Sequence, residues 1–264
     1  MKKRIALAVE YDGSAYHGWQ IQKKPAVPTV QARLETALGK VADQPVHTVC
    51  AGRTDTGVHA SAQVVHFDTT VCRPLRAWVQ GANTQLPDDI SVLWATDPGQ
   101  DFHARFSAIR RTYRYIILNR PTRSAVLSKK VTHVPRSLDI TAMQQAGSYL
   151  LGERDFSAFR GAGCQSNSPF RNVDQITLHQ SGDLIITEIS ANAFLLHMVR
   201  NIMGVLLAIG QGDQPPIWAK QVLESRDRRQ AGITARPDGL YLVAVDYPSQ
   251  FNLPILTKGP VFLP

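Results

Sequence analysis

Residues 46–67 read VHTVCAGRTDTGVHASAQVVHF and predict two strands, near 46–51 and 61–68, joined by a polar loop. Gly52 and Gly57 bound that loop, can adopt positive φ angles and let the backbone approach a ligand. Asp55 lies between them, two residues after Arg53. A carboxylate held on such a loop beside a cation is a candidate nucleophile or acid–base group. The same residues also fit an Asx turn that only shapes a hairpin.

Outward from this loop, strand and helix patterns follow one another in the same order twice. In the first half the loop is preceded by a strand at 3–10 and a helix at 28–40, and followed by a helix near 73–84 and a strand near 90–96. The second half has a strand at 112–119, a helix near 139–151, strands near 172–179 and 183–190, helices near 192–210 and 216–225, and a strand at 240–246. Each half has the β-α-β-β-α-β order of a ferredoxin-like unit.

The expected fold class is therefore α+β, with two ferredoxin-like halves at residues 1–105 and 106–248. We expect the halves to join into one extended, mainly antiparallel sheet, because edge-to-edge pairing removes two exposed strand edges. Helices would cover one face, and an active-site cleft would lie between the halves. The segment 102–111 is the natural connector, and the proline-rich end, 249–264, reads as a tail that is either packed on the surface or frayed.

Composition places the chain among globular proteins, with 264 residues of which 44% are hydrophobic. No apolar run is long enough to span a bilayer, and the basic start at residues 1–4 is followed by strand-like alternation rather than a signal peptide. A cytoplasmic location is therefore expected. The three cysteines show no CxxC spacing and the eight histidines no HExxH pattern, so neither a disulfide framework nor a metal site is predicted.

The formal net charge of +8 is unevenly distributed along the chain. Residues 105–136 contain no Asp or Glu and nine cations: Arg105, Arg110, Arg111, Arg114, Arg120, Arg123, Lys129, Lys130 and Arg136. Such a stretch, interleaved with aromatic residues, is typical of a surface that binds a polyanion. A solvated basic face is the alternative, and a membrane-binding surface is disfavoured because the segment reads as strand and loop.

Two further features suggest a site. The segment 192–210 reads as a largely buried helix with Arg200 in its middle, and a buried guanidinium needs a partner, for which Asp55 is a candidate. Alternatively, Arg200 reaches solvent along its own stem. Tyr113 and Tyr115 share one strand face, where a tyrosine beside arginines either stacks on a nucleobase or belongs to the core.

The chain resembles the bacterial tRNA pseudouridine synthase A (TruA) family. The resemblance is carried by YDG-x-x-Y-x-GWQ at 11–20, GRTD-x-GVHA at 52–60, FHARFSA at 102–108, R-x-YRY at 111–115, CQS at 164–166, ANAFL-x-HMVRNI at 191–202 and GLYL at 239–242. It covers essentially the whole chain.

The resemblance implies an isomerase that converts uridine to pseudouridine at positions 38, 39 and 40 of the tRNA anticodon stem-loop. Asp55 would be the nucleophile, attacking either ribose C1′ or pyrimidine C6. Arg200 would be its ion-pair partner, and Tyr113 would stack on the flipped base and is a candidate acceptor of the C5 proton. Arg53 would help to extrude the target nucleotide.

The resemblance also implies RNA contacts from the residues Arg73, Phe102, His103, Ala104, Arg105, Phe106, Arg123, Gly163, Cys164, Gln165, Ser166, Asn167 and Arg171. It implies a homodimer and no metal or other cofactor. Two rivals remain. Asp55-Thr56-Gly57 matches the Asp-Thr-Gly of aspartic proteases, although Arg53 would disturb the shared proton of such a site. The other is a tRNA-binding or chaperone module without catalysis on the same scaffold.

Overall fold

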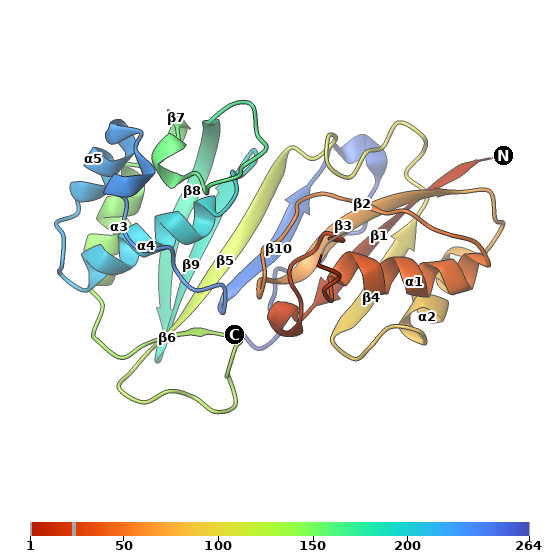
Figure 1. The fold of residues 1–264 in the computed structure, drawn as a ribbon, viewed down its shortest axis with the longest axis horizontal. Coiled ribbons are helices and arrows are strands. Elements are labelled where there is room, and N and C mark those ends of the chain that lie inside the picture. Colours follow the sequence, from red (N-terminus) through yellow and green to blue (C-terminus); the bar gives the residue numbers. More distant parts are fainter. Residues whose placement is uncertain (1, 23–24, 264) are drawn as a thin grey trace. The chain divides into compact units, whose positions relative to one another are not determined.

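The computed structural model describes residues 2–22 and 25–263, which form two compact units (Figure 1). One unit ends at Ile109 and resumes at Tyr241, and the other spans Arg110–Leu240. The described residues include ten strands and five α-helices, and most strand pairs are antiparallel. The α+β class expected from the sequence is thereby confirmed.

The first unit contains β1 (Lys3–Tyr11), α1 (Val30–Ala42), β2 (Val49–Cys50), β3 (His59–Thr69), α2 (Leu75–Asn83) and β4 (Ile90–Thr96), with a 3₁₀ turn, η1, at Gly13–Ala15. β1 lies between β3 and β4 and is antiparallel to both, and β2 pairs with β3. The resulting order, β4-β1-β3-β2, is ferredoxin-like, as the sequence predicts. Figure 1 shows α1 and α2 together along this part of the sheet.

Local chemistry sets the element bounds in this unit. The hydroxyl of Thr29 accepts a hydrogen bond from the backbone N–H of Ala32, so α1 begins at Val30 rather than at the expected residue 28. The strand expected at 46–51 is only two residues long in the structure, and most of that stretch is irregular.

The helix-free face of the first unit is covered by chain from outside the β-α-β-β-α-β pattern. Phe102, Ala104 and Phe251 form a buried cluster with Ala6 of β1 and Val64 of β3. Because both faces of the strand are covered, β1 is buried without interruption through its centre instead of alternating between core and solvent.

The end of the chain packs with the first unit. β10 (Leu240–Asp246) pairs in parallel with β3, which places Tyr241 opposite His59 and Leu242 opposite Ala60. A 3₁₀ turn, η4, follows at Ser249–Phe251. The unit boundary therefore lies at residue 240, within the half that the sequence pattern assigns to 106–248.

The second unit contains β5 (Arg110–Asn119), β6 (Thr132–Val134), α3 (Ile140–Ser148), β7 (Gly152–Asp155), β8 (Phe170–Ser181), β9 (Leu184–Ala191), α4 (Met198–Gly210) and α5 (Trp218–Ser225), with 3₁₀ turns η2 (Ser157–Phe159) and η3 (Arg228–Gln230). β9 lies between β5 and β8 and is antiparallel to both. The order β5-β9-β8 thus repeats β1-β3-β2 of the first unit. The short strands β6 and β7 carry too little pattern to be predicted, and they pair with β5 and β8.

The prediction of a long helix at 192–210 was wrong at its start, because α4 begins at Met198. His197 adopts a left-handed conformation with φ of +60°, which a right-handed helix cannot contain. The preceding apolar residues pack as irregular chain, with the ring of Phe194 edge-on to Tyr113. None of the described helices, α4 included, combines the length and apolar character needed to cross a membrane.

Candidate active site

Asp55 is half-buried on the loop 51–58, which connects β2 to β3 in the first unit. Gly57 has a φ of +78°, and the N–H of Val58 donates to the carbonyl oxygen of Asp55 over 3.1 Å, closing a tight turn around the carboxylate. At the base of the loop, Gln63 of β3 bonds both the N–H and the carbonyl of Gly52. The loop is therefore held at both ends, and the turn keeps Asp55 at its tip.

A second loop, 11–20, forms hydrogen bonds to the same turn. The hydroxyls of Tyr11 and Thr54 lie 2.7 Å apart, and the N–H of Trp19 donates to the carbonyl oxygen of Thr54 over 3.0 Å. The N–H of Gly57 donates to the carbonyl of Tyr16. The two motifs thus form one hydrogen-bonded structure, and the residues on both sides of Asp55 are fixed by it.

Gly18 makes this contact between loops possible. Its φ is +87°, and a β-carbon at this position would lie 2.7 Å from the carbonyl oxygen of Thr54. The position therefore requires glycine for both its conformation and its close approach. The motif at 11–20 therefore supports the Asp55 loop through hydrogen bonds to Thr54 and Gly57.

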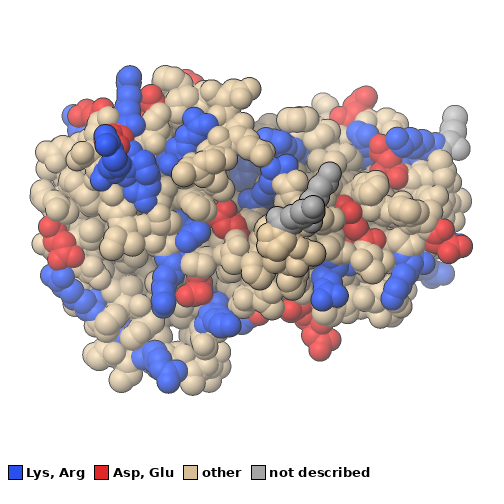
Figure 2. Space-filling model, in the orientation of Figure 1, with Lys and Arg blue, Asp and Glu red and all other residues tan. Residues whose placement is uncertain are grey.

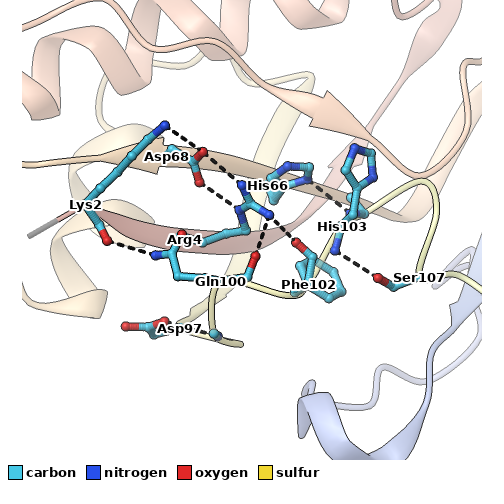
Figure 3. A network of polar contacts seen from close by, with 11 residues as sticks. Lys2, Arg4, His66, Asp68, Asp97, Gln100, Phe102, His103 and Ser107 are labelled. Carbon is cyan, nitrogen blue, oxygen red and sulfur yellow. Dashed lines mark hydrogen bonds and ion pairs between the residues drawn. The ribbon is translucent and has the colours of Figure 1, made fainter.

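The predicted RNA-contact residues at 102–106 lie on a loop that side chains of β1 and β3 hold by hydrogen bonds (Figure 3). Arg4 of β1 donates through Nη1 to the carbonyl oxygens of Gln100 and Phe102, each over 2.8 Å. Asp68 of β3 holds the same guanidinium through two further bonds of 2.7 and 2.9 Å. The bonds from Arg4 lower the pKa of the Asp68 carboxyl to about 2.

His66 anchors the same loop from β3. Its Nδ1 accepts the backbone N–H of Ala104 over 3.1 Å (Figure 3). Burial, together with the nearby charge of Arg4, lowers the pKa of His66 to about 4. The imidazole is therefore neutral at physiological pH and free to accept this bond.

Within this loop the buried and exposed positions alternate. Phe102 and Ala104 are completely buried, so their side chains act as anchors. The ring of His103 lies 4.3 Å from the ring of Phe106, which is 76% exposed, and the guanidinium of Arg105 lies over Phe106 at 5.5 Å. The loop thus presents an arginine and an aromatic ring to solvent on a rigid base, a combination suited to stacking on bases and binding phosphate.

The remaining predicted cations of the first unit are exposed. Arg53 lies on the Asp55 loop, two residues before the carboxylate. Arg73 lies just before α2, and its Nε donates to the carbonyl oxygen of Val41 over 3.4 Å. Both guanidinium groups lie at the surface, where an RNA backbone could reach them.

In the second unit, Tyr113 lies on β5 opposite Ile189 of β9, and its ring meets Phe194 edge-on at 5.2 Å between centroids. Tyr115, on the same strand face, is fully buried and bonds the hydroxyl of Thr132 and the carbonyl of Arg236. Burial raises the pKa of Tyr115. Both tyrosines are buried, with 8% of Tyr113 exposed and none of Tyr115.

Arg200 occupies the first turn of α4, not the middle of a longer helix. Its Nε donates to the carbonyl oxygen of Ala235 over 2.9 Å, and the N–H of Ala235 donates back to the carbonyl of Arg200. A cation in the first turn of a helix adds to the positive end of the helix dipole. This location favours an anion beside Arg200.

The loop 160–171 is organised by two arginines. Arg160, which the sequence reading did not single out, donates through Nη2 to the carbonyls of Cys164 and Ser166 over 2.8 and 2.7 Å. Arg171 donates to the hydroxyl of Ser166 and to the carbonyl of Ser168. Arg171 therefore positions the loop, and the loop in turn exposes Gly163, Gln165 and Asn167.

Cys164 is half-buried in this loop, and its thiol accepts the backbone N–H of Leu196 over 3.4 Å. Burial alone would raise its pKa, but the hydrogen bonds from Leu196, Ser166 and Arg160 outweigh burial and lower it.

Arg123 is exposed on the loop between β5 and β6.

The basic stretch 105–136 contains only positive charges in sequence, but in the fold some of them lie beside carboxylates. Arg111 is buried and donates to the carbonyl of Asn192. Three others meet a carboxylate from a distant segment, in the pairs Arg114–Glu188, Arg120–Asp183 and Arg136–Asp213. Figure 2 accordingly shows Lys and Arg spread over the visible face with Asp and Glu among them. These ion pairs offset the charge of three of the nine cations, so the basic character of the stretch is weaker in the fold than its sequence suggests.

Comparison with known proteins agrees with this arrangement. The family model described as tRNA pseudouridine synthase matches residues 7–107 and 146–248. The chain belongs to the tRNA pseudouridine synthase family. The tRNA pseudouridine synthase A of Coxiella burnetii is 57% identical over 261 residues, 99% of each chain. Proteins of the same name from Nitrosococcus oceani and Shewanella amazonensis are 57% identical over 255 residues and 54% over 261, and the matches cover at least 97% of each chain.

Pseudouridine synthases are isomerases, and this chain is therefore an isomerase whose family acts on uridine in tRNA. Relative to that reaction, sequence reasoning missed the supporting residues Arg4, His66 and Arg160. Arg4 and His66 sit in strands where period-2 patterns show no special role, whereas Arg160 directly precedes the Gly161-Ala162-Gly163 run and could have been singled out.

Proposed function

We propose that this protein converts uridine to pseudouridine at positions 38, 39 and 40 of the tRNA anticodon stem-loop, with Asp55 as the nucleophile. The observation that carries the proposal is the fixed turn around Asp55. Hydrogen bonds from loop 11–20 hold Thr54 and Gly57 on either side of the half-buried carboxylate. Such preorganisation is what a nucleophile needs, because a displacement of about 1 Å at a reacting group can cost about 100-fold in rate.

The reaction requires no change of oxidation state. Asp55 attacks either ribose C1′ or pyrimidine C6, and the N1–C1′ bond breaks while the uracil stays in the pocket. The uracil then turns, and C5 bonds to C1′ while the bond to Asp55 breaks and regenerates the carboxylate. The proton on C5 passes to a base, for which Tyr113 is the candidate, and N1 takes up a proton. Each step uses groups of the chain and its substrate, so no cofactor is called for.

Arg200 and Tyr113 complete the proposed site. Arg200 would pair with the Asp55 carboxylate and keep it ionised, and its position in the first turn of α4 supports this role because the helix dipole also attracts an anion. Tyr113 would stack on the target base and is the candidate acceptor of the C5 proton. Its edge-on contact with Phe194 supports a fixed ring orientation.

For the target base to reach Asp55, it must leave its stack. Flipping costs a few kcal/mol and is cheapest where stacking is incomplete, as at the junction of the anticodon stem and loop. The exposed guanidinium of Arg53 would occupy the space that the base vacates. Arg105 and Phe106, with Arg73, Arg123 and the loop 163–168, would bind the RNA backbone.

A homodimer acting in the cytoplasm completes the proposal. Modest clusters of cations on one chain support a dimer, since two copies would together offer enough charge to hold a large RNA.

Tritium release from tRNA labelled at uridine C5 tests the reaction and the nucleophile together. Wild type should deliver tritium to water, and Asp55→Asn should lower the rate by at least about a thousandfold while still binding tRNA. Asp88→Asn, which removes an exposed carboxylate before β4, is the matched control and should retain wild-type release. Release by Asp55→Asn at the wild-type rate would refute the nucleophile.

The same assay separates the alternative function. Tight tRNA binding with no release from wild type would indicate a binding or chaperone module. The positions are tested by mapping pseudouridine in transcripts whose uridines at 38, 39 and 40 are replaced by cytidine. Product elsewhere in those transcripts would contradict the proposed positions.

A further inference from the structure

Asn201 follows Arg200 in α4 and is completely buried. Its amide nitrogen donates to the carbonyl oxygen of Phe159 over 2.8 Å. Its amide oxygen accepts from the hydroxyl of Thr234 over 2.7 Å and from Nη2 of Arg228 over 3.1 Å. Because a carbonyl can only accept and a guanidinium can only donate, this set of partners fixes the orientation of the amide. A satisfied network of this kind is rigid.

Arg228 also closes the segment 228–235, here called the strap, upon itself. Nη1 donates to the carbonyls of Ala231 and Gly232 over 3.2 and 3.1 Å, and Nη2 donates to the hydroxyl of Thr234 over 2.8 Å. One side chain thus binds both the strap and the buried amide of Asn201. The shape of the strap is therefore coupled to the first turn of α4.

The strap lies directly against α4 and holds Arg200 twice. The N–H of Ala235 donates to the backbone carbonyl of Arg200 over 3.1 Å, and Nε of Arg200 donates to the carbonyl of Ala235 over 2.9 Å. A β-carbon on Gly204, one turn further along, would come within 1.9 Å of the carbonyl oxygen of Ile233. The glycine in the helix is what allows the strap to approach so closely.

We propose that Asn201, Arg228 and Thr234 are positioning residues that fix the guanidinium of Arg200 through the strap. The proposal rests on the role proposed above for Arg200. An arginine side chain has several rotatable bonds, and a bond from Nε to a fixed carbonyl restricts most of them. The three residues act on the reaction only through Arg200, so loosening them should lower kcat and leave tRNA binding intact.

The test is Thr234→Val, which keeps the shape of the side chain and removes the hydroxyl shared by Asn201 and Arg228. We expect kcat to fall about 10-fold or more, with KM for tRNA unchanged within about twofold. Thr234→Ser restores the hydroxyl and should recover most of kcat. Thr187→Val is the matched control, because the Thr187 hydroxyl is buried in β9 with no hydrogen-bond partner among the described residues. It should behave as wild type.

A second measurement reports on Arg200 without catalysis. In protein labelled with ¹⁵N-arginine, the Nε–H signal of Arg200 is assigned by its loss in Arg200→Lys. Its exchange with solvent should be slow in wild type and in Thr234→Ser, and at least about 10-fold faster in folded Thr234→Val. Unchanged exchange in Thr234→Val would overturn the proposal.

The two measurements also separate this inference from the proposed function. Faster exchange with wild-type kcat in Thr234→Val, while Arg200→Lys is impaired, would overturn the positioning role. If Arg200→Lys retains wild-type kcat, a flexible ammonium group serves as well as the held guanidinium and the positioning role is overturned. Wild-type kcat in Arg200→Gln would refute the proposed ion pair itself. A loss of kcat in Thr187→Val equal to that in Thr234→Val would reduce the effect to general stability and overturn the inference.

Discussion

Replacing Gly18 with alanine should displace the turn that carries Asp55. Gly18 lies in loop 11–20 with a φ of +87°, and a new β-carbon would lie 2.7 Å from the carbonyl oxygen of Thr54. The same oxygen already accepts the N–H of Trp19. The added methyl group therefore pushes on the residue that precedes the proposed nucleophile.

The size of the effect follows from the geometry. An ordinary contact begins near 3.4 Å, so the Thr54 carbonyl must retreat by 3.4 − 2.7, about 0.7 Å. Since a misplacement of about 1 Å can cost about 100-fold, kcat should fall between about 10-fold and 100-fold. The left-handed conformation adds about 1–2 kcal/mol of instability for any residue with a β-carbon.

Gly99→Ala separates the two contributions. Gly99 has nearly the same φ, +86°, but a β-carbon there would meet no atom within 4 Å. Both variants should therefore lose stability in thermal unfolding, whereas only Gly18→Ala should lose kcat in the tritium-release assay. Equal kcat for Gly18→Ala and Gly99→Ala would refute the reasoning that loop 11–20 fixes Asp55.

Two further outcomes are expected. Burial and Arg4 lower the pKa of His66 to about 4, so unfolding takes up a proton below the ordinary pKa of 6.5. The free energy of unfolding, measured by urea denaturation, should fall as pH drops from about 6.5 to 4. His66→Gln should lose that part of the slope, and an unchanged slope would contradict the assignment. Arg105→Ala should weaken tRNA binding and reduce the slope of log K against log salt by about one, because a phosphate contact is lost. Arg229→Ala is the control, since Asp227 already neutralises that charge, and an equal change in both variants would count against a specific role for Arg105.

The order of elements in both units was predictable because it depends on local chemistry. Period-2 apolar patterns specified β1, β4, β5 and β10 closely, and β10 matched its expected bounds at Leu240–Asp246. The loop of Asp55 was also visible, since glycines and short polar residues mark a turn wherever they fall. The helix α4 was predicted too long because apolar composition alone does not reveal the left-handed residue at His197.

The sequence by itself determined the α+β class, the Asp55 turn and the motif that contains Arg200, because periodicity and turn chemistry act over a few residues. Only the tertiary structure decided what those motifs touch. Loop 11–20 supports the turn of Asp55 although the two are distant in sequence. The hydrogen-bonded residues Tyr11 and Thr54, for example, are 43 positions apart. Arginines of the basic stretch 105–136 form ion pairs with Glu188, Asp183 and Asp213, which lie 63 to 77 residues away in the sequence. Such contacts depend on which strands and helices pack together, and no local pattern encodes that.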